Sequence, residues 1–308
     1  MTDIAVITIT KNEEKHLPRY FAKLEPLQPK EIFLVDSLST DQTKAMAEER
    51  GAKVLDHAWP GFYATQYNWA IDNCPVTAKW VLRLDADEYL SSETVQRLKD
   101  GLEKLPDDVT ALTLELRRVF MGGVIHYGTA GIRSVRVWRT GACRIENREM
   151  DEHMVVLRGR TVDFDGAFYD DTLQSFGQWR EKHYVYARKE AANYFKVFCD
   201  IKNIKNPSPT DVKKVQYYKW PYYFRGLVYF AIRYCKLGGF LDGVAGWRWH
   251  FWQGYWYRWL VDTYICEAKN ESAVKVLFWR IVSVLGLVTL HLLMVPLILL
   301  GLCVSHKD

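Results

Sequence analysis

The sequence predicts an α/β protein with a mostly parallel sheet and flanking helices, followed by an aromatic-rich helical region and a C-terminal transmembrane helix. Three observations predict this architecture. In the first hundred residues, apolar β-branched runs alternate with helical patterns, and repeated strand–helix units build parallel sheets covered on both faces. Residues 217–259 contain 18 aromatic residues in 43. Residues 281–304 contain no Lys, Arg, Asp or Glu.

The strands expected in the first hundred residues are short apolar runs. Residues 4–10 are apolar and β-branched, which is typical of a strand buried on both faces. Residues 31–36, 53–56 and 80–84 are the next three strands. Ligands of parallel α/β sheets bind beyond the carboxyl ends of the strands, so polar residues at those ends are the candidates for function.

Helices are expected between these strands, at residues 12–24, 41–50 and 62–73. Ser39, Thr40 and Asp41 offer an N-cap for the second helix, and Gly51 ends it. After about residue 110 the strands become shorter, with the clearest at 111–116 and 134–138, and a helix is expected over about 176–204.

This pattern divides the chain into three parts. We expect an α/β domain over 1–205, an aromatic and basic helical region over 206–270, and a transmembrane segment over 274–304.

Composition excludes several classes of protein. The 308 residues carry a net charge of only +4 and no Lys/Arg-rich run, so a nucleic-acid partner is not expected. The six cysteines form no Cys-x-x-Cys pair, which argues against a zinc site and a disulfide scaffold. Met1, Thr2 and Asp3 lead directly into the first strand without a basic leader, so we expect most of the chain in the cytosol.

The strongest chemical signal is the run Asp85-Ala86-Asp87-Glu88 after an apolar strand. On an extended chain, carboxylates two residues apart lie on one side. Clustered carboxylates are unfavourable unless a cation or solvent compensates their charge, and Mg²⁺ is usually held by one or two carboxylates plus substrate phosphates. The alternative is that these residues only cap the next helix, but Ser91-Ser92-Glu93 already offers that cap.

Polar residues also follow the first two strands. Asp36 ends the second strand and Ser39 follows it, where they can accept hydrogen bonds from a nucleotide or serve only the turn. The segment from Thr8 to Glu14 ends the first strand with the same two interpretations.

Together, three segments resemble the ordered motifs of family-2 glycosyltransferases: Thr10-Lys11-Asn12-Glu13-Glu14, residues 35–43 and Leu84-Asp85-Ala86-Asp87-Glu88. The resemblance covers about residues 3–120 well and continues more loosely to about 200. It implies the Rossmann-like GT-A fold, transfer of a sugar from a nucleotide diphosphate with inversion, and use of Mg²⁺ or Mn²⁺. By resemblance, Thr8, Glu13 and Asp36 contact the nucleotide, Asp85 reaches the ribose or metal, and Asp87 binds the metal.

Inverting transfer requires a general base that takes the proton of the acceptor hydroxyl. Family members carry this carboxylate well after the Asp-x-Asp pair, where this chain has residues 149–156. Glu152 is our first candidate and Asp151 the second, with His153 as an orienting or phosphate-binding residue. A solvated acidic turn is the alternative interpretation.

Further candidates for phosphate or acceptor binding are Lys182 and His183 on a helix, and Arg233 in the aromatic region. A solvated helix face explains the first two equally well. The aromatic region also contains Gly238-Gly239-Phe240-Leu241-Asp242-Gly243, which resembles a stretch that follows the catalytic domain in lipopolysaccharide-core members of the family.

The C-terminal segment is long enough to span a bilayer core of about 30 Å. Lys269, Lys275 and Arg280 precede it, which by the positive-inside rule places the catalytic domain on the cytoplasmic face of the inner membrane. Pro296 leaves a re-entrant hairpin open. Tyr and Trp favour the headgroup layer, so region 217–259 is expected at the membrane interface or in the core of a helical subdomain.

The sequence therefore predicts a membrane-associated inverting glycosyltransferase. Its donor is a nucleotide-sugar, with a UDP-hexose expected, and its acceptor is a lipid-linked or polysaccharide hydroxyl. A homo-oligomer is compatible with the sequence. The alternatives are a nucleotidyltransferase, which should have a glycine-rich loop that residues 10–14 lack, and a catalytically inactive membrane scaffold.

Overall fold

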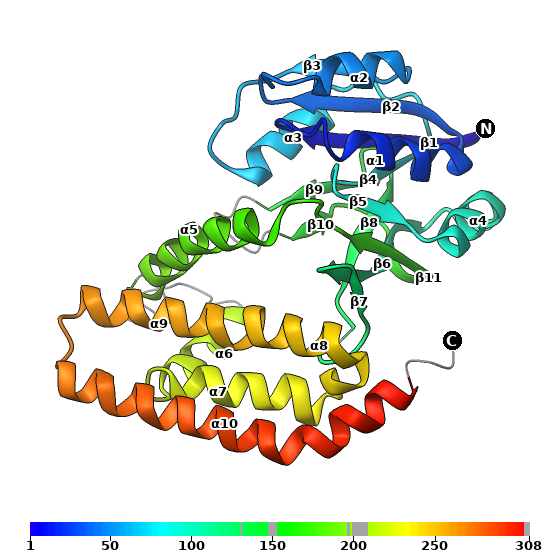
Figure 1. The fold of residues 1–308 in the computed structure, drawn as a ribbon. Coiled ribbons are helices and arrows are strands. Elements are labelled where there is room, and N and C mark those ends of the chain that lie inside the picture. The colour runs from blue at the N-terminus through cyan, green and yellow to red at the C-terminus, as the bar shows by residue number, and fades with distance from the viewer. Residues whose placement is uncertain (130, 147–152, 196–197, 199–208, 305–308) are drawn as a thin grey trace. The chain divides into compact units, whose positions relative to one another are not determined.

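The computed structural model describes residues 1–129, 131–146, 153–195, 198 and 209–304. By its internal contacts the chain forms two compact units (Figure 1). The first consists of Met1–Val119 and Gly131–Leu173, and the second of Phe120–Ala130 and Gln174–Asp308.

The first unit alternates strands and helices up to residue 104 and is then mainly strands. Its elements are β1 (Thr2–Thr10), α1 (Leu17–Leu24), η1 (Glu25–Leu27), β2 (Pro29–Asp36), α2 (Thr43–Glu49), β3 (Lys53–Asp56), α3 (Tyr63–Asn73), β4 (Trp80–Arg83), β5 (Glu88–Leu90), α4 (Ser92–Gly101), η2 (Leu102–Lys104), β6 (Val109–Phe120, ending at the second unit), β8 (Arg133–Arg139), β9 (Cys143–Ile145), β10 (Met154–Val156) and β11 (Arg160–Asp170).

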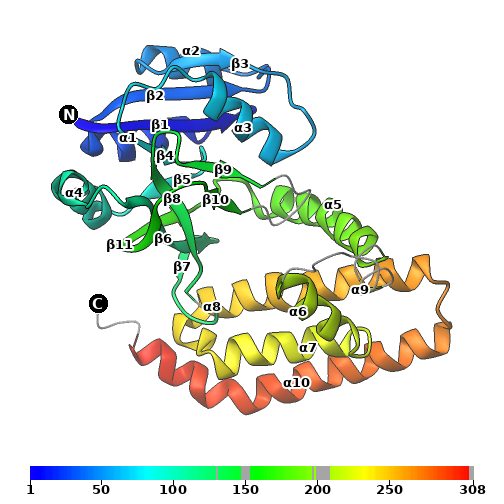
Figure 2. The same ribbon diagram turned by 180° about the vertical axis from the view of Figure 1, so that it is seen from behind.

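The predicted sheet is present, with strand order β3-β2-β1-β4-β8-β6-β11-β5 (Figures 1 and 2). Strands β3, β2, β1 and β4 are parallel neighbours, and β6 and β11 form another parallel pair. Strands β8 and β5 run antiparallel to their neighbours. The register pairs Thr10 with Asp36 and Asp36 with Asp56, so the first three strands end side by side.

Both faces of the sheet are covered, which explains why β1 is apolar at almost every position. Ile4 and Val6 pack with helices α1, α2 and α4 on one face. Ala5 and Ile7 pack with α3 and with β9 on the other. The alternation has the two-residue period of a strand, and it buries apolar side chains on both faces.

One local prediction differs from the structure and another is confirmed. Helix α1 begins at Leu17 rather than near residue 12, because the residues between form a turn in which Asn12 has a φ of 57°. The predicted cap of α4 is confirmed, since the Ser91 side chain accepts a hydrogen bond of 3.1 Å from the N–H of Thr94.

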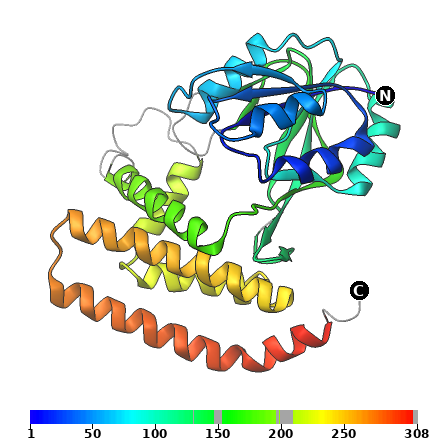
Figure 3. The ribbon, with the colours of Figure 1, turned by 45° about the horizontal axis from the view of Figure 1, so that its top comes forward.

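The second unit is almost entirely helical (Figure 3). Its elements are β7 (Gly123–Ile125), α5 (Phe176–Tyr194), α6 (Pro209–Tyr218), α7 (Phe224–Ala231), η5 (Ile232–Lys236), η6 (Gly239–Asp242), α8 (Gly243–Trp249), η7 (His250–Trp256), α9 (Tyr257–Ala268) and α10 (Ala273–Val304).

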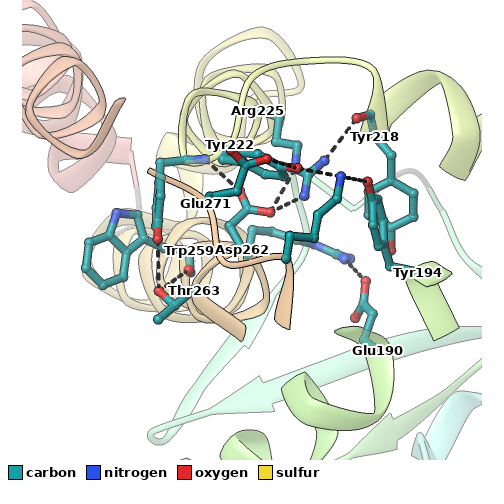
Figure 4. Close-up of polar contacts among 12 residues, drawn as sticks. Glu190, Tyr194, Tyr218, Tyr222, Arg225, Trp259, Asp262, Thr263 and Glu271 are labelled. Atoms are coloured by element: carbon teal, nitrogen blue, oxygen red, sulfur yellow. Dashed lines mark hydrogen bonds and ion pairs between the residues drawn. The ribbon is translucent and has the colours of Figure 1, made fainter. Parts of the chain in front are cut away.

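A buried ion pair lies in the helical core of this unit (Figure 4). The guanidinium of Arg225 on α7 donates to Asp262 on α9, with an Nε–Oδ1 distance of 2.8 Å, and both side chains are almost fully buried. Asp262 also accepts the backbone N–H of Tyr223 at 2.6 Å, and Arg225 donates to the carbonyl of Tyr218 at 3.1 Å. Each charge is thus matched by several hydrogen bonds, as burial of charge requires.

The aromatic residues of region 217–259 supply much of this core. Buried members include Tyr218, Phe230, Tyr234 and Tyr255. Trp220, in contrast, is half exposed. Helical-core packing, one of the two interpretations open from the sequence, therefore holds for many of these residues.

Helix α10 is long and apolar enough over Ala273–Met294 to cross a membrane, by length and composition. It runs alongside α7 and α8 at one margin of the unit (Figures 1 and 3).

Candidate active site

The carboxyl ends of β1 and β2 are joined through Asp36. Its Oδ2 accepts a hydrogen bond of 2.9 Å from the Thr10 hydroxyl, and its Oδ1 accepts the backbone N–H of Ser39 at 2.6 Å. The Ser39 hydroxyl also donates to Asp36 at 2.6 Å. The Asp36 side chain is fully buried, so in this conformation it fixes the loop that follows β2.

The loops after β1 and β2 bind each other along their length. The N–H of Asn12 donates to the Ser39 hydroxyl at 2.8 Å, and the Asn12 side chain accepts the N–H of Thr40 at 2.9 Å. The N–H of Glu13 donates to the Thr43 hydroxyl at 2.7 Å. Two motifs some thirty residues apart in the sequence thus form one structural element at the sheet edge.

Glu13, in the loop after β1, contacts His16. The His16 Nδ1 lies 2.6 Å from Glu13 Oε2, and its Nε2 lies 3.0 Å from the backbone N–H of Leu173. Because Nε2 must accept that N–H, the ring proton is on Nδ1 and is donated to Glu13. His16 therefore links the first motif to the segment that follows β11.

The segment Asp85–Glu88 is a hydrogen-bonded turn and not the extended chain expected from the sequence. The N–H of Glu88 donates to the carbonyl of Asp85 at 2.9 Å, and the Glu88 carboxylate accepts the N–H of Asp85 at 2.9 Å. The guanidinium of Arg136 on β8 donates twice to Glu88, at 2.8 and 2.9 Å. Arg136 also lies 4.0 Å from the ring centroid of Phe168, which fixes it from a second side.

Helix α3 and strand β4 supply the side chains that contact the Asp85 carboxylate. The Tyr67 hydroxyl donates to its Oδ1 at 2.9 Å, and Arg83 lies 3.6 Å from its Oδ2. Burial alone would raise the pKa of Asp85, but the charges of Arg83 and Arg136 and the Tyr67 hydrogen bond together lower it. Asp85 is therefore an ionised carboxylate at neutral pH.

Asp87 has the opposite environment. Among the described residues, hydrogen bonds reach its backbone carbonyl, from Arg19 and from the N–H of Asp171, but none reaches its carboxylate. Burial and the neighbouring carboxylates, Asp170 first and then Asp85 and Glu13, raise the pKa of Asp87 to about 7. A half-buried carboxyl group in acidic surroundings without a donor is a site that a cation would stabilise.

The residues present fit a hard divalent cation. Carboxylate oxygens are the ligands that Mg²⁺ prefers, and a typical site combines one or two of them with substrate phosphates. No set of three or more His, Cys, Asp or Glu side chains is arranged as a metal site in the part of the chain that the structure describes. Asp87, with Asp85 beside it, matches the type of site that the substrate completes.

Two acidic residues next to Asp87 were missed in the sequence. Asp170 ends β11 and pairs with Glu88 of β5 across the antiparallel ladder. Asp171 follows it and accepts a hydrogen bond of 2.7 Å from Arg19. The sequence did offer a signal for them, because two carboxylates at the end of a strand resemble the two carboxylates, Asp85 and Asp87, that follow β4.

The two candidates for the general base, Asp151 and Glu152, lie outside the described residues. They belong to the connection between β9 and β10, whose ends are joined by Glu146 and His153. The N–H of Glu146 donates to the carbonyl of His153 at 3.0 Å, and the Nδ1 of His153 lies 2.8 Å from Glu146 Oε1. His153 is exposed.

Helix α3 connects this hairpin to the Asp85 turn. The Asn68 side chain exchanges two hydrogen bonds with the backbone of Ile145 on β9, at 2.9 and 3.0 Å. Tyr67, the preceding residue, bonds Asp85. Neighbouring residues of one helix therefore hold both the acidic turn and strand β9.

Thr8 differs from the other nucleotide candidates because its side chain is fully buried in the sheet. Its hydroxyl donates to the carbonyl of Leu84 at 2.7 Å and lies 2.6 Å from the Tyr20 hydroxyl. Thr8 thus ties β1 to the residue before Asp85, and its contact with a nucleotide stays a prediction.

Lys182, His183 and Arg233 lie in the second unit. The His183 Nδ1 donates to the carbonyl of Trp179 at 2.8 Å, its ring stacks on that of Trp179, and burial lowers its pKa. Arg233 donates to the carbonyl of Gly128 at 2.9 Å and to the Tyr229 hydroxyl at 3.0 Å. These contacts hold the helical unit together, and phosphate binding by the three residues stays a prediction.

Comparison with known proteins gives one family. Residues 5–134, which contain most of β1, the elements from α1 to β6 and the acidic turn, match the family described as "Glycosyl transferase family 2". An uncharacterised glycosyltransferase of Rickettsia felis is 40% identical over 103 residues, which are 33% of this chain and 34% of the relative. One of Rickettsia typhi is 31% identical over 176 residues, which are 55% of this chain and 58% of the relative.

The chain thus spans between a third and three fifths of the length of these two relatives. Among solved structures, residues 1–349 of S. aureus TarS are similar at 14% sequence identity and a TM-score of 0.42, covering 89% of this chain and 93% of that one.

Proposed function

Residues 5–134 are a family-2 glycosyltransferase domain, and from this premise we propose that the protein transfers a sugar from a nucleotide diphosphate-sugar to a hydroxyl group. The expected donor is a UDP-hexose. The expected acceptor is a lipid-linked or lipopolysaccharide-type glycan.

The observation that carries the proposal is the environment of Asp87. Its carboxyl group lies at the sheet edge with Asp85, Asp170 and Glu13 as acidic neighbours, and no donor of the described residues bonds to it. Such a group is unfavourable in the free protein and becomes favourable when a divalent cation and a diphosphate bind. A structural carboxylate would have its own donors, as Glu88 and Asp36 do.

In the proposed complex, Asp87 and Asp85 would hold Mg²⁺ or Mn²⁺. The cation supplies charge neutralisation of the leaving diphosphate. Arg19 keeps the backbone of Asp87 in place by donating to its carbonyl, and Tyr67 and Arg83 orient Asp85. The protein thus prepares both carboxylates before the donor binds.

The joined loops after β1 and β2 are the proposed nucleotide site. Glu13, Asp36 and Ser39 belong to this element, and Thr8 ties β1 to Leu84, the residue before Asp85. The Asp36 carboxylate is already hydrogen-bonded to Thr10 and to the loop after β2. Its proposed role is therefore to orient the loop backbone and Ser39 toward the base or ribose.

We propose Glu152 as the general base, with Asp151 as the second candidate. The carboxylate takes the proton of the acceptor hydroxyl as its oxygen forms the new bond to the anomeric carbon. Attack on the face opposite the leaving diphosphate inverts the configuration at that carbon. Metal dependence and inversion are both part of the proposal.

The proposed site of action is the cytoplasmic face of the inner membrane. The apolar helix α10 is the attachment, whether it crosses the bilayer or lies in its surface layer. Lys269, Lys275 and Arg280 near its beginning suit anionic headgroups on the cytoplasmic side.

The test is release of nucleotide from a panel of UDP-, GDP-, CMP- and dTDP-sugars by the purified full-length protein in detergent, with Mn²⁺ or Mg²⁺ and a membrane lipid extract as the acceptor source. We expect release of one nucleoside diphosphate, lost in Asp87→Asn. Asp107→Asn is the matched control, because this fully exposed carboxylate precedes β6.

Two results would contradict the proposal. Pyrophosphate release from a nucleoside triphosphate and a sugar phosphate would identify a nucleotidyltransferase. Absence of turnover together with absence of nucleotide binding would support the inactive scaffold.

A further inference from the structure

The outward face of helix α10 is largely apolar over Val274–Leu293, where Lys275 and Thr289 are its exposed polar residues. Nine large apolar side chains on it are between 48 and 79% exposed: Val274, Leu277, Phe278, Ile281, Val284, Leu285, Val288, Leu292 and Leu293. At 100° per residue these positions fall on one continuous arc of the helix. Exposed apolar surface of this extent marks a contact surface.

The opposite face of α10 is fixed to the helical unit. Leu287, Leu290 and Met294 join the core that contains Leu227 and Phe230 of α7. Gly286 is in close contact with α7, since a Cβ there would lie 2.4 Å from a Leu227 side-chain carbon. Helix α10 therefore packs lengthwise and does not project from the unit.

Polar contacts strengthen this attachment. The Ser283 hydroxyl donates to the carbonyl of Tyr223 at 3.0 Å and lies 3.0 Å from the Tyr255 hydroxyl. Arg280 donates to the Tyr223 hydroxyl at 3.0 Å, and the Trp247 indole donates to His291. These contacts to α7, α8 and η7 would be lost if α10 left the unit and entered lipid alone.

Helix α10 could cross a bilayer either alone or together with the helices it packs on, and both orientations conflict with the contacts described above. A crossing helix that left the unit would expose Arg280, Ser283 and His291 to hydrocarbon. A crossing helix that kept its partners would take α7, η6 and α8 with it, along with charged residues such as Arg248. A charged Arg side chain is strongly unfavourable in the hydrocarbon core of a bilayer.

The surroundings of α10 suit the headgroup layer. Trp220 is 51% exposed and stacks on Phe224, whose ring contacts Trp279 of α10, and Trp is favoured at the membrane interface. Residues 209–304 contain 11 Lys and Arg against 5 Asp and Glu, a net charge of +6. A basic unit with one apolar helix face is complementary to an anionic lipid surface.

We propose that α10 lies in the plane of a bilayer surface, with its outward face in the acyl chains and its other face against α7 and α8. The occupant of the apolar face is an anionic phospholipid leaflet. This inference refines the membrane attachment proposed above and is independent of sugar transfer, so it is tested without activity.

The test measures depth in the membrane. A fluorescent amino acid is placed at Leu277, Leu285 or Leu292 of the full-length protein, which is bound to vesicles of phosphatidylethanolamine and phosphatidylglycerol. Quenchers at known depths in the lipid then locate each probe. We expect all three at one shallow depth, about 5–10 Å into the headgroup and acyl boundary.

A crossing helix would place the outer two probes about 22 Å apart in depth, since they are separated by 15 residues at about 1.5 Å each, and that result would overturn the proposal. The proposal would also be overturned if the wild type did not bind the vesicles and a second copy of the chain covered the apolar face of α10 instead.

Charge substitutions provide a second measurement. Leu285→Glu and Val288→Glu should each reduce flotation with the vesicles several-fold, while Val185→Glu should not. Val185 is exposed on α5 of the same unit, so this control adds the same charge away from α10. Equal flotation of the three variants would contradict the proposed lipid contact.

Discussion

Arg136 on β8 binds both carboxylate oxygens of Glu88, at 2.8 and 2.9 Å, and the two side chains are 11 and 6% exposed. Through Glu88, the central sheet determines the shape of the acidic turn, because the same carboxylate accepts the N–H of Asp85. A strand more than forty residues away in the sequence thus prepares the candidate metal site.

Arg136→Gln should destabilise the first unit by about 3–5 kcal/mol, since it leaves a buried carboxylate without its partner. Thermal unfolding measures this loss. The double variant Glu88→Gln/Arg136→Met should recover much of the stability, because it removes both charges, yet remain less active because the Asp85 turn has lost its support. Full recovery of activity in the double variant would contradict a positioning role for Arg136.

Tyr67→Phe should weaken metal-dependent nucleotide binding roughly 10-fold, the usual scale for a residue that orients a metal ligand. The change removes only the hydroxyl that bonds Asp85. Titration of UDP at fixed Mn²⁺ measures the effect, and Tyr63→Phe, at an exposed position of the same helix, is the control. Unchanged affinity in Tyr67→Phe would exclude the proposed role of this hydrogen bond.

Glu152→Gln should reduce sugar transfer by roughly 10²–10⁴-fold, the usual contribution of a general base, and leave the affinity for UDP and Mn²⁺ unchanged. Asp151→Asn should have a much smaller effect on transfer. The reverse order would assign the base to Asp151, and a loss of nucleotide binding in Glu152→Gln would show that this residue contacts the donor instead.

Asp262→Ala should destabilise the helical unit by about 3–5 kcal/mol, because Arg225 would remain buried and charged. Glu267→Ala, an exposed acidic position on the same helix, should change stability by less than about 0.5 kcal/mol. Chemical denaturation followed by tryptophan fluorescence compares the two. Similar denaturation midpoints for the two variants would mean that the Arg225–Asp262 ion pair in Figure 4 contributes little to stability.

His250 should make the stability of the helical unit depend on pH. Burial, together with the charge of Arg233, lowers the pKa of His250 to about 3 from about 6.5. The unfolded chain therefore binds a proton between these values and the folded one does not, so stability is full above about pH 6.5 and falls by up to about 1.4 kcal/mol per pH unit below it.

Unfolding curves measured from pH 8 to pH 4 test this, with His250→Asn as the variant that removes the titration. Its pH dependence should be correspondingly flatter than that of the wild type. An unchanged slope would show that His250 accepts a proton in the folded state.

The sequence predicted the sheet well because its strands carry local signals. Residues 53–56 are strand β3 as predicted, and β1 and β2 extend their predicted ranges only at their N-terminal ends. Helix α1 was placed too early because the residues before Leu17 bond to the loop after β2, a tertiary contact that overrides helical preference.

The candidate site was predicted in its residue types and only partly in its geometry. Asp85 and Asp87 were identified from their position after a strand, but their different environments depend on distant partners. Tyr67 and Arg136 reach Asp85 and Glu88 from other elements, and β11 brings Asp170 to the same place. Register between strands about eighty residues apart has no local signal.

The central claim is that Asp87 serves a metal-bound nucleotide diphosphate. Calorimetric titration of the full-length protein with UDP, with and without Mn²⁺, tests it most directly in the wild type, Asp87→Asn and Asp107→Asn. We expect metal-dependent binding in the wild type and in Asp107→Asn, and an affinity at least about 10-fold lower in Asp87→Asn. Equal metal-dependent binding by Asp87→Asn and the wild type would contradict it.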